Sequence, residues 1–225
     1  MSMLTPLLAT DPAAPRLTVY DETAGTRMEF SAVTLDNWAN KIANMLIDEF
    51  DNPHTILLDL PVSWQAAVLP IGITTAGLNA TVDTAQNITP TSEPRLVFTT
   101  TSRAELWVDA GVTDVAVVSD DPFGRGVLES GGQLPLGTVD FGPTVRFYGD
   151  QYYGDTPDLA QWHNPEIADT PERLLIPGWR DSEEFDRRIL APLAADGSVV
   201  VVTGMASAER LAHIAETEKV TRQLA

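Results

Sequence analysis

Aromatic and acidic side chains gather in one stretch of this 225-residue sequence that has no regular apolar pattern. Residues 148–155 read YGDQYYGD, and two tryptophans follow further along the chain. Aromatic rings beside carboxylates can line a pocket for a small molecule. The candidate pocket residues are Tyr152, Tyr153, Trp162 and Trp179. The same rings could instead cover the edge of a sheet, because amphipathic rings suit a half-buried surface, and both interpretations stay open.

The sequence contains no motif that is typical of a catalytic, metal or cofactor site. The three histidines, His54, His163 and His213, lack the spacing of metal ligands. An apolar run at residues 199–203 and Gly204 begin like a dinucleotide-binding turn, but no second glycine follows. Neither a G-x-x-x-x-G-K-[ST] loop nor a G-x-S-x-G elbow is present. We therefore predict no catalytic residue, no cofactor and no metal ion.

The charge and composition exclude further classes of function. Fourteen basic and 32 acidic residues give a net charge of −18, which repels phosphate backbones and argues against nucleic-acid binding. The chain has no cysteine, so disulfides and thiol nucleophiles are excluded. No apolar stretch has transmembrane length, and the first ten residues do not form a secretory signal. We expect a soluble, cytoplasmic protein without a membrane partner.

The clearest predicted helix covers residues 31–50, where apolar residues recur at helical spacing and form one stripe. Ser31 or Thr34 could cap its first turn by accepting an amide hydrogen bond. This amphipathic pattern indicates a helix that packs on one side of a larger core.

A strand, a buried helix and a second strand follow in order. Residues 55–60 are an apolar run without alternation, which is typical of a strand buried on both faces. Residues 63–76 form a nearly all-apolar helix that contains Pro70 and ends at Gly77, and residues 78–82 form the next strand. Such a crossover unit predicts a parallel sheet.

The same alternation continues along the chain. The other predicted strands are residues 17–20 and 26–30, which form a hairpin, and 95–99, 115–118, 144–148, 174–176 and 198–202. The other predicted helices are residues 4–9, 102–110, 182–193 and 207–217. Residues 119–143 are rich in Gly, Pro and Asp and are expected to form a long surface excursion. The predicted fold is α/β, with a mostly parallel sheet, helices on both faces and a small N-terminal hairpin, in one domain over residues 1–225.

Several segments resemble one known family in the same order. FSAVTL at residues 30–35 leads into WANKIANML at 38–46, and ILLDLP at 56–61 precedes an apolar helix. LAPLAADGSVVV at residues 190–201 precedes EKVT at 218–221. In this order the segments resemble the N-terminal domain of the adenylate-forming (AMP-binding) superfamily, which includes the acyl-CoA synthetases. The chain also resembles a small actinobacterial family that shares a shortened version of this plan.

The resemblance implies where a nucleotide-binding loop would lie. The superfamily's T-S-G-[ST]-T-G-x-P-K-G loop belongs between Ser119 and Leu174, and nothing there matches it. After Pro177 the superfamily often has an aromatic–His pair, whereas this sequence has Gly178 and Trp179. The sequence ends before the superfamily's later adenine, ribose and lysine motifs. We therefore predict a pseudoenzyme that does not catalyse adenylation, and the missing loop argues against an enzyme.

Three functions stay open at this point. The first is a non-catalytic relative of adenylate-forming enzymes that acts by protein association, with a second copy of the chain or another protein as its partner. The second is a binding module that keeps part of an acyl or nucleotide pocket. The third is an acyl-CoA ligase that a partner completes.

Overall fold

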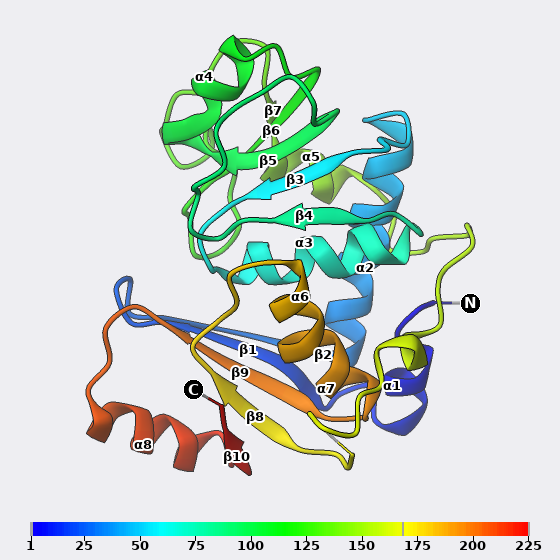
Figure 1. The fold of residues 1–225 in the computed structure, drawn as a ribbon, viewed down its shortest axis with the longest axis vertical. Coiled ribbons are helices and arrows are strands. Elements are labelled where there is room, and N and C mark those ends of the chain that lie inside the picture. The colour runs from blue at the N-terminus through cyan, green and yellow to red at the C-terminus, as the bar shows by residue number, and fades with distance from the viewer. Residues whose placement is uncertain (1, 168, 225) are drawn as a thin grey trace. The chain divides into compact units, whose positions relative to one another are not determined.

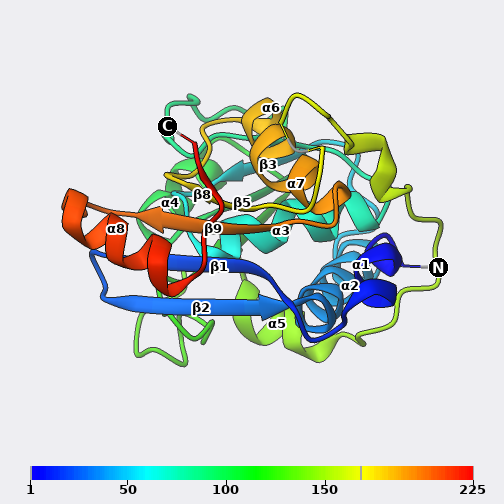
Figure 2. The ribbon, with the colours of Figure 1, turned by 90° about the horizontal axis from the view of Figure 1, so that it is seen from below.

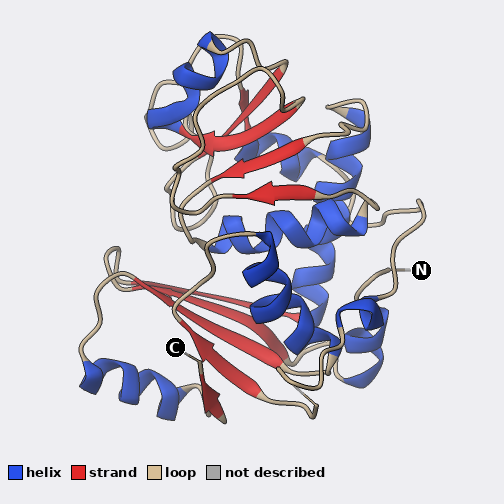
Figure 3. Ribbon diagram, in the orientation of Figure 1, coloured by secondary structure: helices blue, strands red, loops and turns tan. Residues whose placement is uncertain are grey.

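The computed structural model describes residues 2–167 and 169–224, and the chain divides into two compact units. Unit 1 comprises Met1–Asp36, Val62–Trp64 and Pro157–Ala225, and unit 2 comprises Asn37–Pro61 and Gln65–Thr156. Each unit has its own five-stranded sheet (Figures 1 and 3). That residues 1–225 form a single domain stays a prediction.

The sheet of unit 1 has the order β10-β8-β9-β1-β2. Its strands are β1 (Pro15–Asp21), β2 (Thr26–Ser31), β8 (Arg173–Ile176), β9 (Ser198–Thr203) and β10 (Arg222–Gln223). β1 and β2 form the predicted antiparallel hairpin, and every other neighbouring pair is parallel. The hairpin is thus built into the edge of a mostly parallel sheet.

Helices flank both faces of this sheet. α8 (Ala208–Thr217) lies along one face (Figure 2), where Ile214 packs in a buried cluster with Val200 and Val202. Ser207 caps α8 by accepting a hydrogen bond from the Arg210 amide. The remaining helical segments of unit 1 are α1 (Thr5–Thr10), the 3-10 turn η1 (Leu159–Trp162), α6 (Ser182–Phe185), the π-helical turn η2 (Asp186–Leu190) and α7 (Ala191–Ala194).

The helix predicted over residues 182–193 forms as the continuous run α6, η2 and α7, with a π-helical turn at its centre. Asp181 caps the run by accepting from the Glu184 amide at 2.9 Å. Pro192 has no amide proton, so it cannot form the usual bond to the carbonyl four residues back. The Ala191 amide instead reaches the Asp186 carbonyl, five residues back. The proline therefore accounts for the irregularity.

The sheet of unit 2 has the order β4-β3-β5-β6-β7, and all of its neighbouring pairs are parallel. Its strands are β3 (Ile56–Asp59), β4 (Ala80–Val82), β5 (Leu96–Thr100), β6 (Asp114–Val118) and β7 (Val139–Asp140). The apolar runs that predicted β3, β5 and β6 are buried, as expected of strands covered on both faces.

The helices of unit 2 are α4 (Thr101–Asp109), α5 (Phe141–Phe147) and most of α2 (Ala32–Asp48) and α3 (Trp64–Thr75). On one face of the sheet Trp107 of α4 packs in a buried cluster with Leu57 and Val97. Phe98 contacts the rings of Phe50 and Phe141 edge-on at 6.2 and 5.9 Å. The mostly parallel α/β organisation with helices on both faces is confirmed.

Residues 144–148 were predicted as a strand, and this prediction is wrong because they lie at the end and just beyond α5. Phe141 and Val145 are both buried and are four residues apart, which is helical spacing. Pro143 lies in the first turn, where its missing amide proton removes no helical hydrogen bond. The β-branched and aromatic residues suggested a strand, but their burial follows the helical period.

Residues 119–143 are also more than the surface excursion that the composition predicted. They contain β7, and the side chains of Asp121, Val127 and Asp140 are buried. Tertiary hydrogen bonds order this segment, although its composition is that of a loop. No helix in the described part of the chain is long and apolar enough to cross a membrane.

Candidate functional site

Two of the predicted pocket residues, Tyr152 and Tyr153, lie in unit 2 after α5. Tyr153 is 88% exposed, and its hydroxyl donates to Oε1 of Gln151 at 2.6 Å. Asn44 of α2 donates to the carbonyls of Gly149 and Gln151, both at 2.9 Å. The tyrosines are therefore held on a segment that is anchored to α2.

The other two predicted residues, Trp162 and Trp179, lie in unit 1. Trp179 is buried and packs edge-on against Phe185 at 5.2 Å between ring centroids. Trp162 ends η1 and forms a side-chain hydrogen bond with Asp186. The four residues are thus distributed over two units, and their role in lining one pocket stays a prediction.

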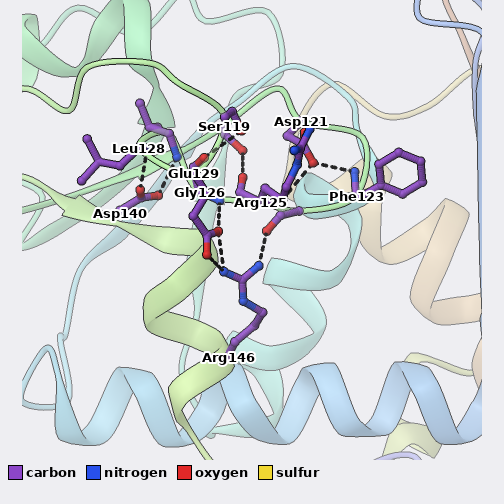
Figure 4. A network of polar contacts seen from close by, with 12 residues as sticks. Ser119, Asp121, Phe123, Arg125, Gly126, Leu128, Glu129, Asp140 and Arg146 are labelled. Atoms are coloured by element: carbon purple, nitrogen blue, oxygen red, sulfur yellow. Dashed lines mark hydrogen bonds and ion pairs between the residues drawn. The ribbon is translucent and has the colours of Figure 1, made fainter.

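The segment after β6 contains a dense polar network, shown in Figure 4, in which three carboxylates accept hydrogen bonds from five backbone amides. The amides are those of Phe123, Arg125, Gly126, Val127 and Leu128. Oδ1 of Asp121 accepts the first two at 2.9 and 3.1 Å, and Oε2 of Glu129 accepts the third at 2.7 Å. The oxygens of Asp140 accept the last two at 3.0 and 3.2 Å. Each carboxylate thus accepts hydrogen bonds from nearby backbone amides, as a bound anion would.

Two arginines complete the network. Nη2 of Arg125 lies 2.7 Å from Oδ2 of Asp121, and Nη2 of Arg146 lies 2.6 Å from Oε1 of Glu129. The hydrogen bonds from Arg125 lower the pKa of Asp121, and those from Arg146 lower the pKa of Glu129. Both carboxylates are therefore ionised at neutral pH, and the two arginines are already paired.

Gly142 allows two backbone segments of the network to approach each other closely. A Cβ atom at Gly142 would lie 2.7 Å from the carbonyl oxygen of Gly124 and 2.8 Å from the amide nitrogen of Gly126. Both distances are shorter than real Cβ contacts, so glycine is required at this position.

Successive backbone amides that point to one side are a common way to bind phosphate. Here the carboxylates of Asp121, Glu129 and Asp140 accept the hydrogen bonds that a phosphate would otherwise accept from such amides. While these carboxylates are in place, the amides of Phe123 and of residues 125–128 are not available to a phosphate group.

A second candidate region is the carboxyl edge of the sheet in unit 2. β3 comes first along the chain, and β4 and β5 lie on its two sides. The chain therefore leaves β3 toward β4 on one side of the sheet and leaves β5 toward β6 on the other side. The direction of the connections reverses at the β3–β5 pair. In open α/β sheets, ligands bind outside the carboxyl ends of the strands at such a topological switch point.

Asp59 ends β3 at this switch point and pairs in register with Thr99 of β5. Its Oδ2 accepts three hydrogen bonds: from the Thr99 hydroxyl at 3.0 Å, from Nε of Arg103 at 2.6 Å and from Nε1 of Trp107 at 2.6 Å. Its Oδ1 is buried and has no hydrogen-bond partner in the described part of the chain. One oxygen of this fully buried carboxylate therefore accepts three hydrogen bonds, and the other accepts none from the described residues.

This region was not predicted from the sequence, although two signals were present. Asp59 is an acidic residue at the end of a strand that is otherwise apolar. Residues 99–102 are all Thr or Ser, and they run from the end of β5 into the start of α4 without an intervening loop. The pairing of Asp59 with residues 99–102 could not be predicted from the sequence, because β4 lies between β3 and β5 along the chain.

Unit 1 contains a separate buried charge. Glu218, just after α8, accepts from the Tyr20 hydroxyl at 2.6 Å and from Nε of Arg27 at 2.8 Å, and it also pairs with Arg173. Burial alone would raise the pKa of Glu218, but the hydrogen bonds from Arg27, Tyr20 and Arg173 lower it to about 2. The carboxylate is therefore fully ionised and joins β1, β2 and β8 to the end of α8.

Comparison with known proteins places the chain in a family. No established family profile matches the sequence. A TIGR03089 family protein from Mycobacterium tuberculosis is 34% identical over 243 residues, which covers 99% of this chain and 96% of that protein. The chain belongs to the TIGR03089 family.

Solved structures show which fold this TIGR03089 protein has. It matches an acyl-CoA synthetase from Brucella canis with a TM-score of 0.70 at 16% identity, over 99% of this chain and 47% of the other. It matches the acetoacetyl-CoA synthetase from Streptomyces lividans with a TM-score of 0.71 at 13% identity, over 99% and 42%. A benzoate CoA ligase from Burkholderia xenovorans gives 0.67 at 12% identity. The predicted resemblance to this superfamily is confirmed for the fold, and the chain spans about half the length of these structures.

Proposed function

We propose that this TIGR03089 protein is a non-catalytic relative of the adenylate-forming enzymes and acts by association with a protein partner. The observation that carries the proposal is the network after β6, where Asp121, Glu129 and Asp140 occupy five backbone amides. Acyl activation requires donors that stabilise charge on the phosphates in the transition state. In part of the segment where the superfamily's phosphate loop would belong, these five amides are already paired within the chain.

Exposed apolar side chains support the association part of the proposal. Leu136 and Phe147 of unit 2 are 94% and 87% exposed, and Met205 of unit 1 is 98% exposed. Each would contribute favourable free energy if a partner covered it, although single exposed apolar side chains are also common on monomeric proteins. The partner is either a second copy of the chain or another protein.

ATP–pyrophosphate exchange tests the catalytic part. We expect no exchange above background with benzoate or acetoacetate, the acids named for two of the structural neighbours. Exchange by the purified protein would contradict the proposal. Exchange that requires added cell extract would instead support the acyl-CoA ligase that a partner completes.

Solution mass and affinity capture test the association part. We expect sedimentation at micromolar concentration to show a species larger than the 24.4 kDa chain, or capture from extract to yield one stoichiometric partner. A strict monomer that captures nothing stoichiometric would argue against association.

The alternative of a small-molecule binding module is favoured by the unfilled Oδ1 of Asp59 at the switch point. A ligand for the folded chain raises its melting temperature, so thermal shifts with ATP, AMP and acyl-CoA compounds test this alternative. Variants of Tyr152, Tyr153, Trp162 and Trp179 to Ala would show whether any shift depends on the predicted pocket residues.

A further inference from the structure

The strand β2 forms one edge of the sheet in unit 1 (Figure 2). Among the described residues it pairs with β1 on one side, and no strand lies on its other side. An edge strand presents a row of backbone N–H and C=O groups to which another strand can add. The outer side of β2 is therefore a candidate surface for a further chain.

The register of β1 shows which groups of β2 face outward. The amide of Glu22, just after β1, donates to the carbonyl of Thr203 in β9 at 3.0 Å. Backbone groups alternate between the two sides of a strand, so the even-numbered residues of β1 bond to β9 and the odd-numbered ones bond to β2. The odd-numbered residues lie opposite residues 26, 28 and 30 of β2. The amides and carbonyls of Arg27 and Glu29 therefore face outward.

These outward groups match a second copy of the same strand. When two β2 strands lie antiparallel about a two-fold axis at Met28, Arg27 of each copy lies opposite Glu29 of the other. Opposite residues whose backbone groups face each other exchange two hydrogen bonds. Both such pairs form at once, because the two-fold axis relates them. The backbone pattern of β2 is thus self-complementary.

The side chains fit the same arrangement. Arg27 and Glu29 are exposed and lie on one face of β2, where they form an ion pair. Opposite charges on directly opposite residues of paired strands are stabilising, and like charges are destabilising. The half-buried Met28 lies on the other face and would contact Met28 of the second copy. One strand therefore supplies both partners of each ion pair, which favours a second copy over an unrelated protein.

We propose that the outer edge of β2 binds β2 of a second copy of this chain, with the two-fold axis at Met28. The five-stranded sheets of the two copies then form one continuous sheet. This inference names the partner and the surface for the association proposed above, and it rests on that part of the proposed function.

Disulfide cross-linking of the full-length chain tests the pairing, because the sequence contains no cysteine. Met28→Cys places its two copies on the axis, where Cα atoms of opposite residues are about 4.5 Å apart, within the span of a disulfide. Thr26→Cys is the control on the same face of β2. Its two copies would be four residues out of register and about 13 Å apart, too far for a disulfide.

We expect oxidised glutathione to convert Met28→Cys to a dimer of twice the 24.4 kDa chain at least about tenfold faster than Thr26→Cys. Equal rates for the two variants, or no cross-linking of Met28→Cys, would overturn the pairing.

A charge reversal tests the ion pairs without a thiol. Glu29→Arg places two arginines opposite each other in both pairs, so we expect sedimentation to show a dimer dissociation constant at least about tenfold higher. Glu105→Arg, at an exposed position of α4, makes the same charge change and should leave the constant within about twofold. Equal effects of the two reversals would contradict the proposed interface.

These measurements separate this inference from the proposed function. An unmodified dimer whose Met28→Cys variant does not cross-link faster than Thr26→Cys overturns the pairing through β2 and leaves association in place. A monomer that binds a different protein stoichiometrically has the same meaning. A strict monomer without any partner overturns both.

Discussion

Single carboxylates carry much of the chemistry in this chain, and each is defined by its partners more than by its position in the sequence. Glu218 is joined to Arg27, which lies 191 residues earlier in the chain. Asp59 receives its three donors from residues 40 to 48 positions later. The sequence shows that such residues are acidic and stand beside apolar runs. It cannot show which arginine or tyrosine will meet them, because those contacts exist only after the sheets have formed.

Removing the charge of Glu218 should destabilise the protein. Its side chain is 5% exposed and pairs with Arg27 and Arg173, so Glu218→Gln leaves two guanidinium groups without their shared carboxylate. We expect chemical denaturation to show a loss of about 3 kcal/mol. Glu216→Gln, an exposed change near the end of α8, should alter stability by less than about 0.5 kcal/mol. Equal stabilities of the two variants would contradict the role assigned to Glu218.

The free energy of unfolding should depend on pH through the same carboxylate. The pKa of Glu218 is lowered from 4.5 to about 2 in the folded chain, so the folded state favours the ionised form. This contribution is fully present above pH 4.5 and is lost as the pH falls from 4.5 toward 2. We expect the free energy of unfolding of the unmodified chain to fall more steeply over this range than that of Glu218→Gln, by about 3 kcal/mol in total. Parallel pH profiles of the two proteins would refute this assignment.

At the scale of elements, the apolar pattern predicted the helices and strands that bury their own side chains. α8 follows a helical period, whereas β3 and α3 were predicted from nearly unbroken apolar runs. The segment between β6 and α5 could not be predicted in this way. Its Gly, Pro and Asp residues indicate a loop, but hydrogen bonds from its carboxylates to its own amides order it (Figure 4). The candidate pocket residues showed the converse limit, because a cluster in sequence was divided between two units.

The close backbone approach in this network can be tested by one methyl group. Gly142→Ala would place a Cβ atom 2.7 Å from the Gly124 carbonyl oxygen, which must then move. We expect a loss of stability of about 1–3 kcal/mol, measured by chemical denaturation. Gly149→Ala is the matched control, since a Cβ atom there has no neighbour within 4 Å. A neutral Gly142→Ala substitution would show that the network is looser than described.

At the scale of the whole molecule, both units are assembled from separate stretches of chain. Unit 1 is built from three stretches and unit 2 from two, and unit boundaries fall inside α2 and α3. The mostly parallel α/β class could be predicted from the order of strands and helices. The division into two sheets could not, because the sequence pattern of a strand does not specify which neighbours it will pair with.

The discontinuous units have a thermodynamic consequence. Unit 1 completes its sheet only when segments from both sides of unit 2 come together, whereas unit 2 is interrupted only by Val62–Trp64. We expect scanning calorimetry to show one cooperative transition, as for a single domain. Two resolved transitions would contradict the single-domain prediction and would show that the units unfold independently.

The most direct test of the central claim is a titration with Mg·ATP, followed through the backbone amide signals of residues 123–128. Asp121, Glu129 and Asp140 occupy these amides, so we predict that the signals stay unchanged at millimolar nucleotide. Saturable movement of these signals, together with exchange of pyrophosphate into ATP, would contradict the account. It would mean that the carboxylates give way and that the segment still holds a triphosphate.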